Sequence, residues 1–264
     1  GVLWLKSQPD PTSGLFGSRI SHDYIYDHAI AAYAMCEAYG LSSYRLLRKP
    51  AQLSINYLES HRNAYSVWRY QPRDLDNDIS VTGWAVMAYK SAKYFNLMVN
   101  EDAMKYAAAF LDEVSSPTGA HGYQRAGESC SRKQGEHEVK FPANKSQALT
   151  AVGLFCRIFL GQDPRERPIM DNAAKLLNRT PPTWNEQDGS IDHYYWYYAT
   201  YALFQMGGTP WAKWQKKLER AVGPNQHSDK GDRNNFGSWD PVGAWGEDGG
   251  RVYSTAILTL TMQA

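Results

Sequence analysis

Two kinds of helical segment alternate along this chain, and that alternation constrains the fold more than any other feature of the sequence. One kind consists of small and apolar residues with few charges, so nearly every face of the helix is apolar. A helix of this kind is expected to be buried on every side. Five segments have this character: Asp27–Gly40, Asp78–Phe95, Asn144–Gly161, Asp192–Gly208 and Arg251–Ala264.

The segments between them are amphipathic and charged. In Pro210–Val222, the side chains of Trp211, Trp214 and Leu218 share one face at helical spacing. Each amphipathic segment is followed by a turn that contains aromatic residues and, in all but VWRYQP, glycine; FGSWDP is an example. The other amphipathic segments are Lys49–Arg62, Asn100–Val114, Pro164–Arg179 and the chain opening GVLWLKSQ.

Buried helices that alternate with half-exposed helices form two concentric layers. The sequence therefore predicts an all-α fold, an α/α toroid (barrel) of about five helical hairpins with apolar helices inside and amphipathic helices outside. An open helical solenoid has the same local pattern and is the alternative. We expect a single domain over residues 1–264, cut from a longer chain at the N-terminus, because the first segment begins in mid-element.

Composition bears on the kind of partner. With 28 basic and 27 acidic residues among 264, the formal net charge is +1, which gives no reason to expect a nucleic-acid partner. No apolar run approaches the ~18 residues of a membrane-spanning helix. Aromatic residues make up 13% of the chain and gather where helices begin, which suits a ligand cavity, although a tyrosine-rich core accounts for them equally well.

Three segments carry a resemblance to a known family. DNDISVTGWAVMAYKSA (76–92) is similar to the inner helix that bears the catalytic Asp motif of squalene-hopene cyclases, and residues 237–260 are similar to their last turn and inner helix. Gln226, followed after an insertion by Gly237 and Trp239, resembles the prenyltransferase and squalene oxidase repeat. The chain thus resembles the terpenoid cyclase and protein prenyltransferase superfamily. That resemblance implies a toroid with a central, aromatic-lined cavity for an isoprenoid or other apolar ligand.

The cyclase chemistry of the family can be set against these residues. Such cyclases protonate an alkene with an aspartic acid in a D-x-D-D motif, which requires a carboxyl group that stays protonated. The alignment places Leu75, Asp76, Asn77 and Asp78 on the motif, so an amide stands at the proton-donating position. Asp76 could replace it only if the loop shifted by one residue.

The zinc chemistry of protein prenyltransferases is a second comparison. The family binds zinc through an Asp, a Cys two residues later and a His on a later inner helix. Here Asp192 aligns with the Asp, but Tyr194 and Ser254 stand at the Cys and His positions. The seven histidines show no paired metal-ligand spacing. We therefore expect no family-type zinc, no other metal site and no cofactor.

The aspartates at the starts of the apolar segments have two interpretations. As N-caps, Asp27, Asp78, Asp192 and the equivalent Asn144 would each accept a backbone N–H, a contact worth about 1 kcal/mol. In a toroid these helix starts share one mouth of the cavity, where further acids such as Asp240 and Asp248 would gather. The two interpretations are compatible. The catalytic candidates are Asp74, Asp76 and Asp78, and the ligand-binding candidates are Tyr24, Trp68, Tyr70, Trp84, Asp192, Tyr195, Trp239, Trp245 and Tyr253.

Three function hypotheses follow. The chain is a terpenoid-cyclase-like domain for an apolar or isoprenoid small molecule, with or without catalysis. Alternatively, it is a non-catalytic module that binds an unknown protein partner. The third hypothesis is a carbohydrate-active α/α-barrel enzyme, which would use paired carboxylates, although no spacing in the sequence selects a pair.

Overall fold

The computed structural model describes residues 1–21 and 23–264; His22, one of the seven histidines discussed above, lies outside them. The chain is all-α, as predicted from the alternation of apolar and amphipathic segments. In the described part, pairing of β type is limited to one isolated bridge between Ser115 and His121. The helices divide between two compact units, Gly1–Val114 with Phe159–Gly161, and Ser115–Ile158 with Gln162–Ala264.

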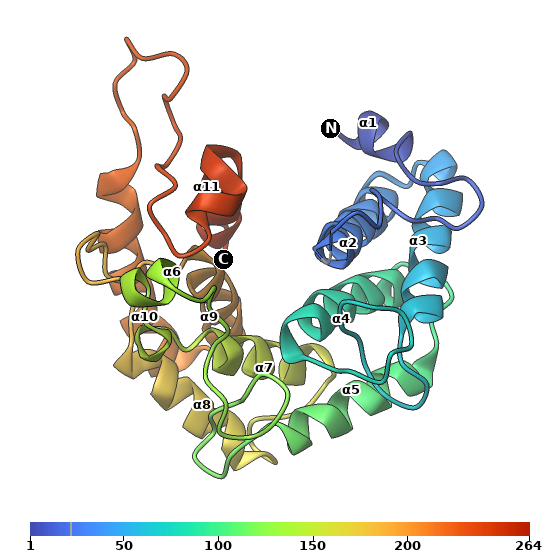
Figure 1. The fold of residues 1–264 in the computed structure, drawn as a ribbon, viewed down its shortest axis with the longest axis horizontal. Coiled ribbons are helices and arrows are strands. Elements are labelled where there is room, and N and C mark those ends of the chain that lie inside the picture. Colours follow the sequence, from blue (N-terminus) through green and yellow to red (C-terminus); the bar gives the residue numbers. More distant parts are fainter. Residues whose placement is uncertain (22) are drawn as a thin grey trace. The chain divides into compact units, whose positions relative to one another are not determined.

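Unit 1 is built around α4 (Ile79–Tyr94), which lies against the three longest of its other helices (Figure 1). Thirteen of the 16 residues of α4 are buried, whereas only four of the 13 residues of the amphipathic helix α5 are buried. This difference agrees with the apolar and amphipathic patterns in the sequence. The other elements of unit 1 are α1 (Val2–Lys6), α2 (Tyr24–Ser42), the short η1 (Arg45–Leu47), α3 (Arg48–His61) and α5 (Glu101–Glu113).

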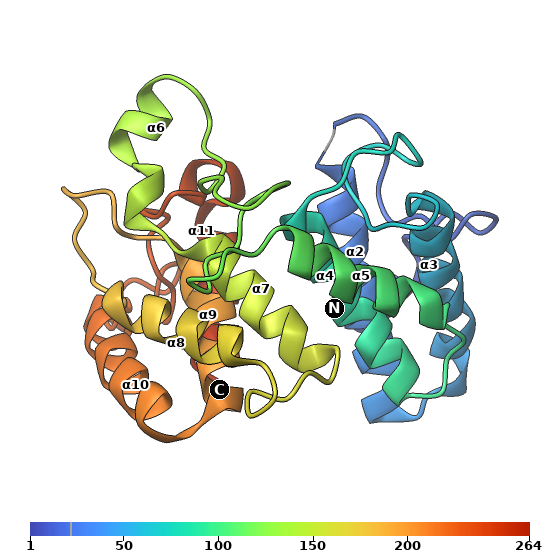
Figure 2. The ribbon, with the colours of Figure 1, turned by 90° about the horizontal axis from the view of Figure 1, so that it is seen from below.

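Unit 2 repeats this arrangement around α9 (His193–Met206), which lies against α8, α10 and α11 (Figure 2). Ten of the 12 residues of the apolar helix α7 are buried, against four of the 15 residues of α10. The elements are α6 (Glu136–Lys140), η2 (Ala143–Lys145), α7 (Ala148–Phe159, whose last residue belongs to unit 1), α8 (Pro168–Arg179), α10 (Gly208–Val222), η3 (Gly223–Asn225) and α11 (Gly246–Thr261).

Four of the five turns after the amphipathic helices share one hydrogen-bond pattern. In four turns of the described chain, a backbone N–H donates to a side chain on the next apolar helix. The bonds run from Phe16 to His28 Nδ1 (3.0 Å), from Trp68 to Thr82 Oγ1 (3.4 Å), from His121 to Thr150 Oγ1 (3.4 Å) and from Trp239 to Thr255 Oγ1 (3.3 Å). Because the bond recurs in both units, each turn and the apolar helix after it form one repeated structural element.

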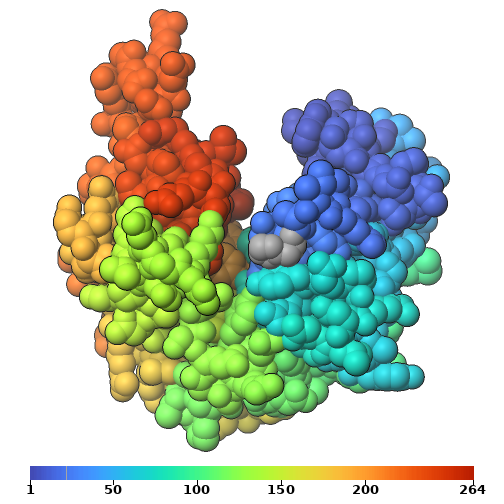
Figure 3. Space-filling model, in the orientation of Figure 1, coloured from blue at the N-terminus to red at the C-terminus, as the bar shows by residue number. Residues whose placement is uncertain are grey.

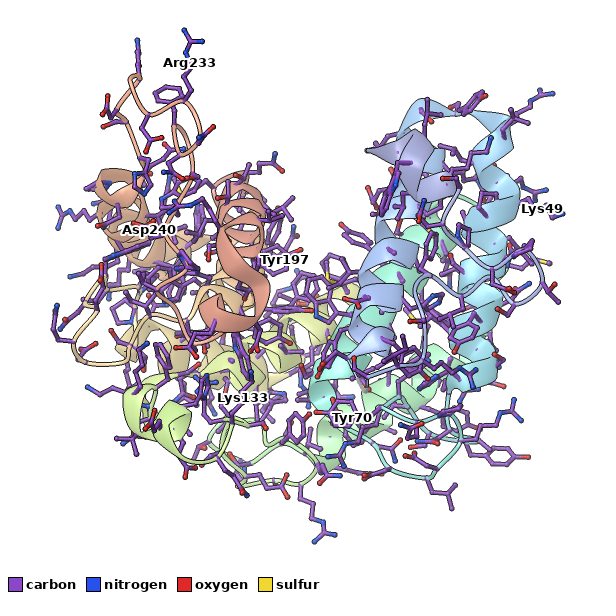
Figure 4. All side chains as sticks on the ribbon, turned by 45° about the horizontal axis from the view of Figure 1, so that its top comes forward. Lys49, Tyr70, Lys133, Tyr197, Arg233 and Asp240 are labelled. Atoms are coloured by element: carbon purple, nitrogen blue, oxygen red, sulfur yellow. The ribbon has the colours of Figure 1, made fainter. Side chains whose placement is uncertain are left out.

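The last of these turns contains a long insertion. Gln226 Nε2 donates to the carbonyl of Gly237 at 2.8 Å, so the Gln and the Gly-x-Trp sequence meet in space and the residues between them loop out. Figure 3 shows this loop standing away from the rest of unit 2, and Figure 4 shows Arg233 at its tip. The insertion therefore leaves the turn of the repeat intact.

Two expectations about the helix starts are wrong. Asp27 lies inside the first turn of α2, which begins three residues earlier at Tyr24, and Asn144 lies in η2, ahead of α7. The final apolar helix also begins earlier than expected, because a turn at Gly246 joins it across a kink at Gly250, where φ is 61°. Only glycine adopts this φ without steric cost.

The apolar helices near the two ends of the chain are not buried all round, contrary to the expectation. In α2, Ile30 is 41% exposed and Leu41 is 77% exposed, and in α11 Val252 is 83% exposed. Over residues 1–21 and 23–264, none of the helices combines the length and the hydropathy needed to span a membrane.

Candidate functional site

Asp78 is the N-cap of α4. Its Oδ1 accepts the backbone N–H of Val81 at 2.8 Å, and its own N–H donates to the carbonyl of Trp68 at 3.1 Å. The residue has no exposed surface. The capping interpretation of this aspartate is therefore confirmed.

The second carboxylate oxygen of Asp78 faces an arginine. Arg69 Nε lies 3.4 Å from Asp78 Oδ2, and the same guanidinium forms an ion pair with Asp76. Its flat face covers the ring of Tyr70, 5.0 Å from the ring centroid, and Tyr70 in turn lies 6.2 Å from the ring of Tyr26. We call these five residues, Tyr26, Arg69, Tyr70, Asp76 and Asp78, the Arg69 cluster.

Asp74 and Asp76 lie outside the helix, as expected. The carboxylate of Asp76 is 49% exposed, and Asp74 Oδ1 accepts the backbone N–H of Asp76 at 3.0 Å. Asn77, at the proton-donating position of the cyclase motif, accepts the backbone N–H of Val67 through Oδ1 at 3.3 Å. The loop is therefore anchored at the position where the family carries its acid.

Unit 2 contains an equivalent arrangement at the start of α9. Asp192 Oδ1 accepts the N–H of Tyr195 at 3.0 Å, while Oδ2 pairs with Arg132 at 2.8 Å and accepts the Ser146 hydroxyl at 2.9 Å. The side chains of Arg132 and Asp192 are 4% and 1% exposed, so this ion pair is fully buried.

An aromatic ring again covers the arginine. The guanidinium of Arg132 lies 5.6 Å from the ring centroid of Trp245. Burial raises the pKa of Tyr253 well above its ordinary value, and the nearby Asp192 carboxylate raises it further. We call Arg132, Ser146, Asp192, Trp245 and Tyr253 the Arg132 cluster.

Four of the predicted ligand contacts are core residues whose polar atoms bond within the protein. The indole N–H groups of Trp68 and Trp239 donate to the carbonyls of Leu58 and Val222 at 2.8 and 2.9 Å. The Tyr195 hydroxyl donates to the Thr180 carbonyl at 2.8 Å, and the Tyr24 hydroxyl lies 3.1 Å from His61 Nδ1. Each of the four is at most 5% exposed, so we assign them to structural roles.

The remaining predicted contacts differ in exposure. Trp84, on α4, is buried, with 8% of its surface exposed. Tyr70, Trp245 and Tyr253 are half-buried. These four stay as candidate ligand contacts.

The aligned zinc positions form no metal site. Tyr194 packs its ring on Tyr198 at 5.0 Å, and Ser254 is fully buried. Within residues 1–21 and 23–264, no group of three His, Cys, Asp or Glu side chains is placed to hold a metal ion.

Most of the acids expected at the helix starts carry a basic partner, which the sequence did not predict. Lys133 pairs with Asp248, and Lys140 pairs with Glu247 at 3.3 Å, so the segment around α6 is tied to the start of α11. Asp240 is paired with Arg251. The expected acidic rim is therefore largely neutralised in unit 2.

Asp27 lies in the first turn of α2 in unit 1. Partial burial raises its pKa, and the neighbouring Asp23 carboxylate raises it further. In the part of the chain that the structure describes, Asp27 has no ion-pair partner, and the residue belongs to the exposed class. The sequence indicated Asp27 only as a candidate N-cap, and nothing in it showed that the residue lies inside α2.

No protein-family model matches this chain, and no curated protein sequence matches it. The two arginine clusters are therefore the main basis for an inference about function.

Proposed function

We propose that this chain binds an isoprenoid or other apolar small molecule and does not protonate it. The resemblance to terpenoid cyclases suggests the ligand class, and the half-buried aromatic rings at the starts of the apolar helices suit such a ligand. Sites of this type are mostly apolar, with a few fixed polar groups. Tyr70 and Trp245 meet that description, because each ring lies against an arginine whose charge is matched by a buried aspartate.

One observation supports the absence of protonation: Asp78 and Asp192 each cap a helix and face an arginine. The oxygens of both carboxylates are therefore engaged by a backbone N–H and a guanidinium, whereas an acid that protonates carbon must lie within reach of its substrate. Asp76 pairs with the same arginine as Asp78, and the side chain of Asn77 is an amide, which cannot donate a proton to carbon. Asp27 has a raised pKa, but its carboxyl group is only partly buried, whereas alkene protonation requires an enclosed site.

The same pairing argues against the carbohydrate-active alternative. Glycoside hydrolysis requires two carboxyl groups, of which one is protonated and the other is ionised. Asp76 and Asp78 instead face the same guanidinium, so their surroundings do not set one apart as the acid and the other as the base.

For the whole chain we propose the α/α toroid that the alternation of helices indicates. The bond that recurs between four of the turns and the next apolar helix supports a continuous repeat. Small-angle scattering should then give a compact particle. An elongated rod would favour the open solenoid.

The binding proposal is tested with a fluorescent polyprenol presented in detergent micelles. Tyr70→Ala and Trp245→Ala should each weaken binding at least about tenfold, which corresponds to about 1.4 kcal/mol. Trp4→Ala and Tyr94→Ala are matched controls, because these rings are 67% and 77% exposed outside both clusters. Equal binding by all variants would contradict the proposed contacts. Failure of the parent chain to bind would leave the interaction module as the better hypothesis.

A further inference from the structure

The loop between α3 and α4 holds three non-glycine residues in the left-handed backbone region. They are Tyr65, Arg73 and Leu75, with φ of 59°, 56° and 69°. Glycine adopts this conformation without the steric cost that a Cβ brings. The side chain of Tyr65 is 82% exposed and that of Leu75 is 76% exposed, so packing does not explain why they are there. Strain of this kind tends to gather at ligand sites.

Hydrogen bonds to Asn63 and to the carbonyl of His61 hold the loop in this strained conformation. Asn63 is buried; its Nδ2 donates to the carbonyl of Asp76 at 2.5 Å, and its Oδ1 accepts the N–H of Leu75 at 3.0 Å. The backbone N–H of Arg73 donates to the carbonyl of His61 at 3.1 Å. The backbone positions of Arg73 and Leu75 are thus fixed by the protein itself.

Two of the strained residues line an open pocket of about 240 Å³ that lies entirely in unit 1. The rings of Tyr65 and Tyr106 form one wall, with centroids 6.2 Å apart and planes at 86°. Arg62 is only 7% exposed, lies 5.6 Å from the Tyr106 ring and is neutralised by Glu59 at 2.7 Å. The pocket is smaller than the roughly 300–1,000 Å³ typical of drug-sized ligands, which fits a single ring.

The residues that line the pocket include both a positively and a negatively charged side chain, Arg73 and Asp102, and each has polar atoms without a protein partner in the described chain. Within residues 1–21 and 23–264, the Arg73 guanidinium makes one hydrogen bond, from Nε to the Ser60 carbonyl at 3.0 Å, which leaves its terminal nitrogens without a protein partner. Asp102 Oδ1 accepts from Lys105 at 2.8 Å, and Oδ2 has no protein partner in the same residues. The site therefore offers donors on Arg73 and an acceptor on Asp102.

These features select the chemistry of the ligand. An anion would meet the Asp102 carboxylate and a cation would meet the Arg73 guanidinium, so a neutral molecule fits best. Neighbouring hydroxyls can each accept from a guanidinium and donate to a carboxylate. The apolar face of a pyranose ring can cover an aromatic ring. We propose that this pocket binds a neutral sugar ring, at a site separate from both arginine clusters.

Saturation-transfer NMR with a panel of neutral methyl glycosides tests the proposal. At least one glycoside should show transfer, and Tyr65→Ala and Asp102→Asn should each weaken its binding at least about tenfold. Tyr65→Gly should lose binding while the protein unfolds at the same or a higher temperature, because the strain is relieved. Tyr94→Ala is the matched control and should bind as the parent chain does.

Three results would overturn the proposal. One is the absence of transfer from every glycoside. Another is binding that survives both Tyr65→Ala and Asp102→Asn. The third is a preference for sulfated or carboxylated sugars that Asp102→Asn strengthens, which would make the pocket an anion site.

Discussion

Replacing Asp192 by asparagine separates its role as a helix cap from its role as a counter-ion. Asparagine caps helices about as well as aspartate, so the bond from the Tyr195 N–H should survive. What is lost is the negative charge opposite Arg132, and both side chains are at most 4% exposed. Removing one partner of a buried ion pair costs about 3–5 kcal/mol.

Two features moderate that cost. Arg132 keeps its hydrogen bonds to the carbonyls of Phe141 and Ser131, and its face stays on Trp245. We therefore expect Asp192→Asn to lower the free energy of unfolding by about 3 kcal/mol, the lower end of that range. The double variant with Arg132→Met should recover part of the loss, because it leaves no unpaired buried charge.

Asp78→Asn is the matched comparison. Arg69 is 17% exposed and keeps Asp76 as a partner, so this variant should lose only about 1 kcal/mol. Urea unfolding, followed by circular dichroism and by tryptophan fluorescence, measures both. The reasoning is refuted if Asp192→Asn unfolds within about 0.5 kcal/mol of the parent chain, or if Asp78→Asn is the more damaging change.

Three further predictions concern groups outside the two arginine clusters: His193, Glu59 and Asp74. His193 is buried with no hydrogen-bond partner on either ring nitrogen in the described chain, so His193→Phe should raise the free energy of unfolding at neutral pH by about 1 kcal/mol in urea titrations. Burial lowers the pKa of His193 from 6.5 to about 4, so the parent chain loses stability as the pH falls through that interval; His193→Phe should reduce this loss, and an unchanged pH profile would contradict the assignment. Burial raises the pKa of Glu59, but hydrogen bonds from Arg62, Tyr89 and Asn100 outweigh it, and its pKa falls below the ordinary 4.5. The stability that Glu59 contributes is therefore present above pH 4.5 and lost in more acidic solution, and Glu59→Gln should flatten the acid limb of the unfolding midpoint against pH. Asp74→Ala should change the free energy of unfolding by less than about 0.5 kcal/mol, since Asp74 is exposed; a thermal scan that shows a larger loss would give it a structural role.

The helices were predictable because burial imposes a local pattern on the sequence. Asp78–Phe95 and Asp192–Gly208 were expected, and α4 and α9 begin directly after Asp78 and Asp192. N-capping depends on residues within one turn, so the sequence shows it. By contrast, α6 has five residues, too few to be stable alone, and its Lys140 pairs with Glu247 of α11, far along the chain.

The ion pairs could not be predicted for a related reason. Arg132 lies 60 residues before Asp192, and nothing local in the sequence marks it as a partner. Nothing in the sequence indicated that the indole N–H groups of Trp68 and Trp239 would donate to backbone carbonyls. Candidate residues could be chosen by type and by helix position, but their roles depend on contacts that form only on folding.

The most direct test of binding without protonation is mass spectrometry of a linear triterpene hydrocarbon after incubation with the chain in deuterium oxide. Cyclisation started by an acid would place one solvent deuterium on carbon, whereas binding alone leaves the mass unchanged. We expect the hydrocarbon to be recovered with the protein, linear and without deuterium. A cyclised, deuterated product that is lost in Asp27→Asn or Asp76→Asn would contradict the account and identify the acid.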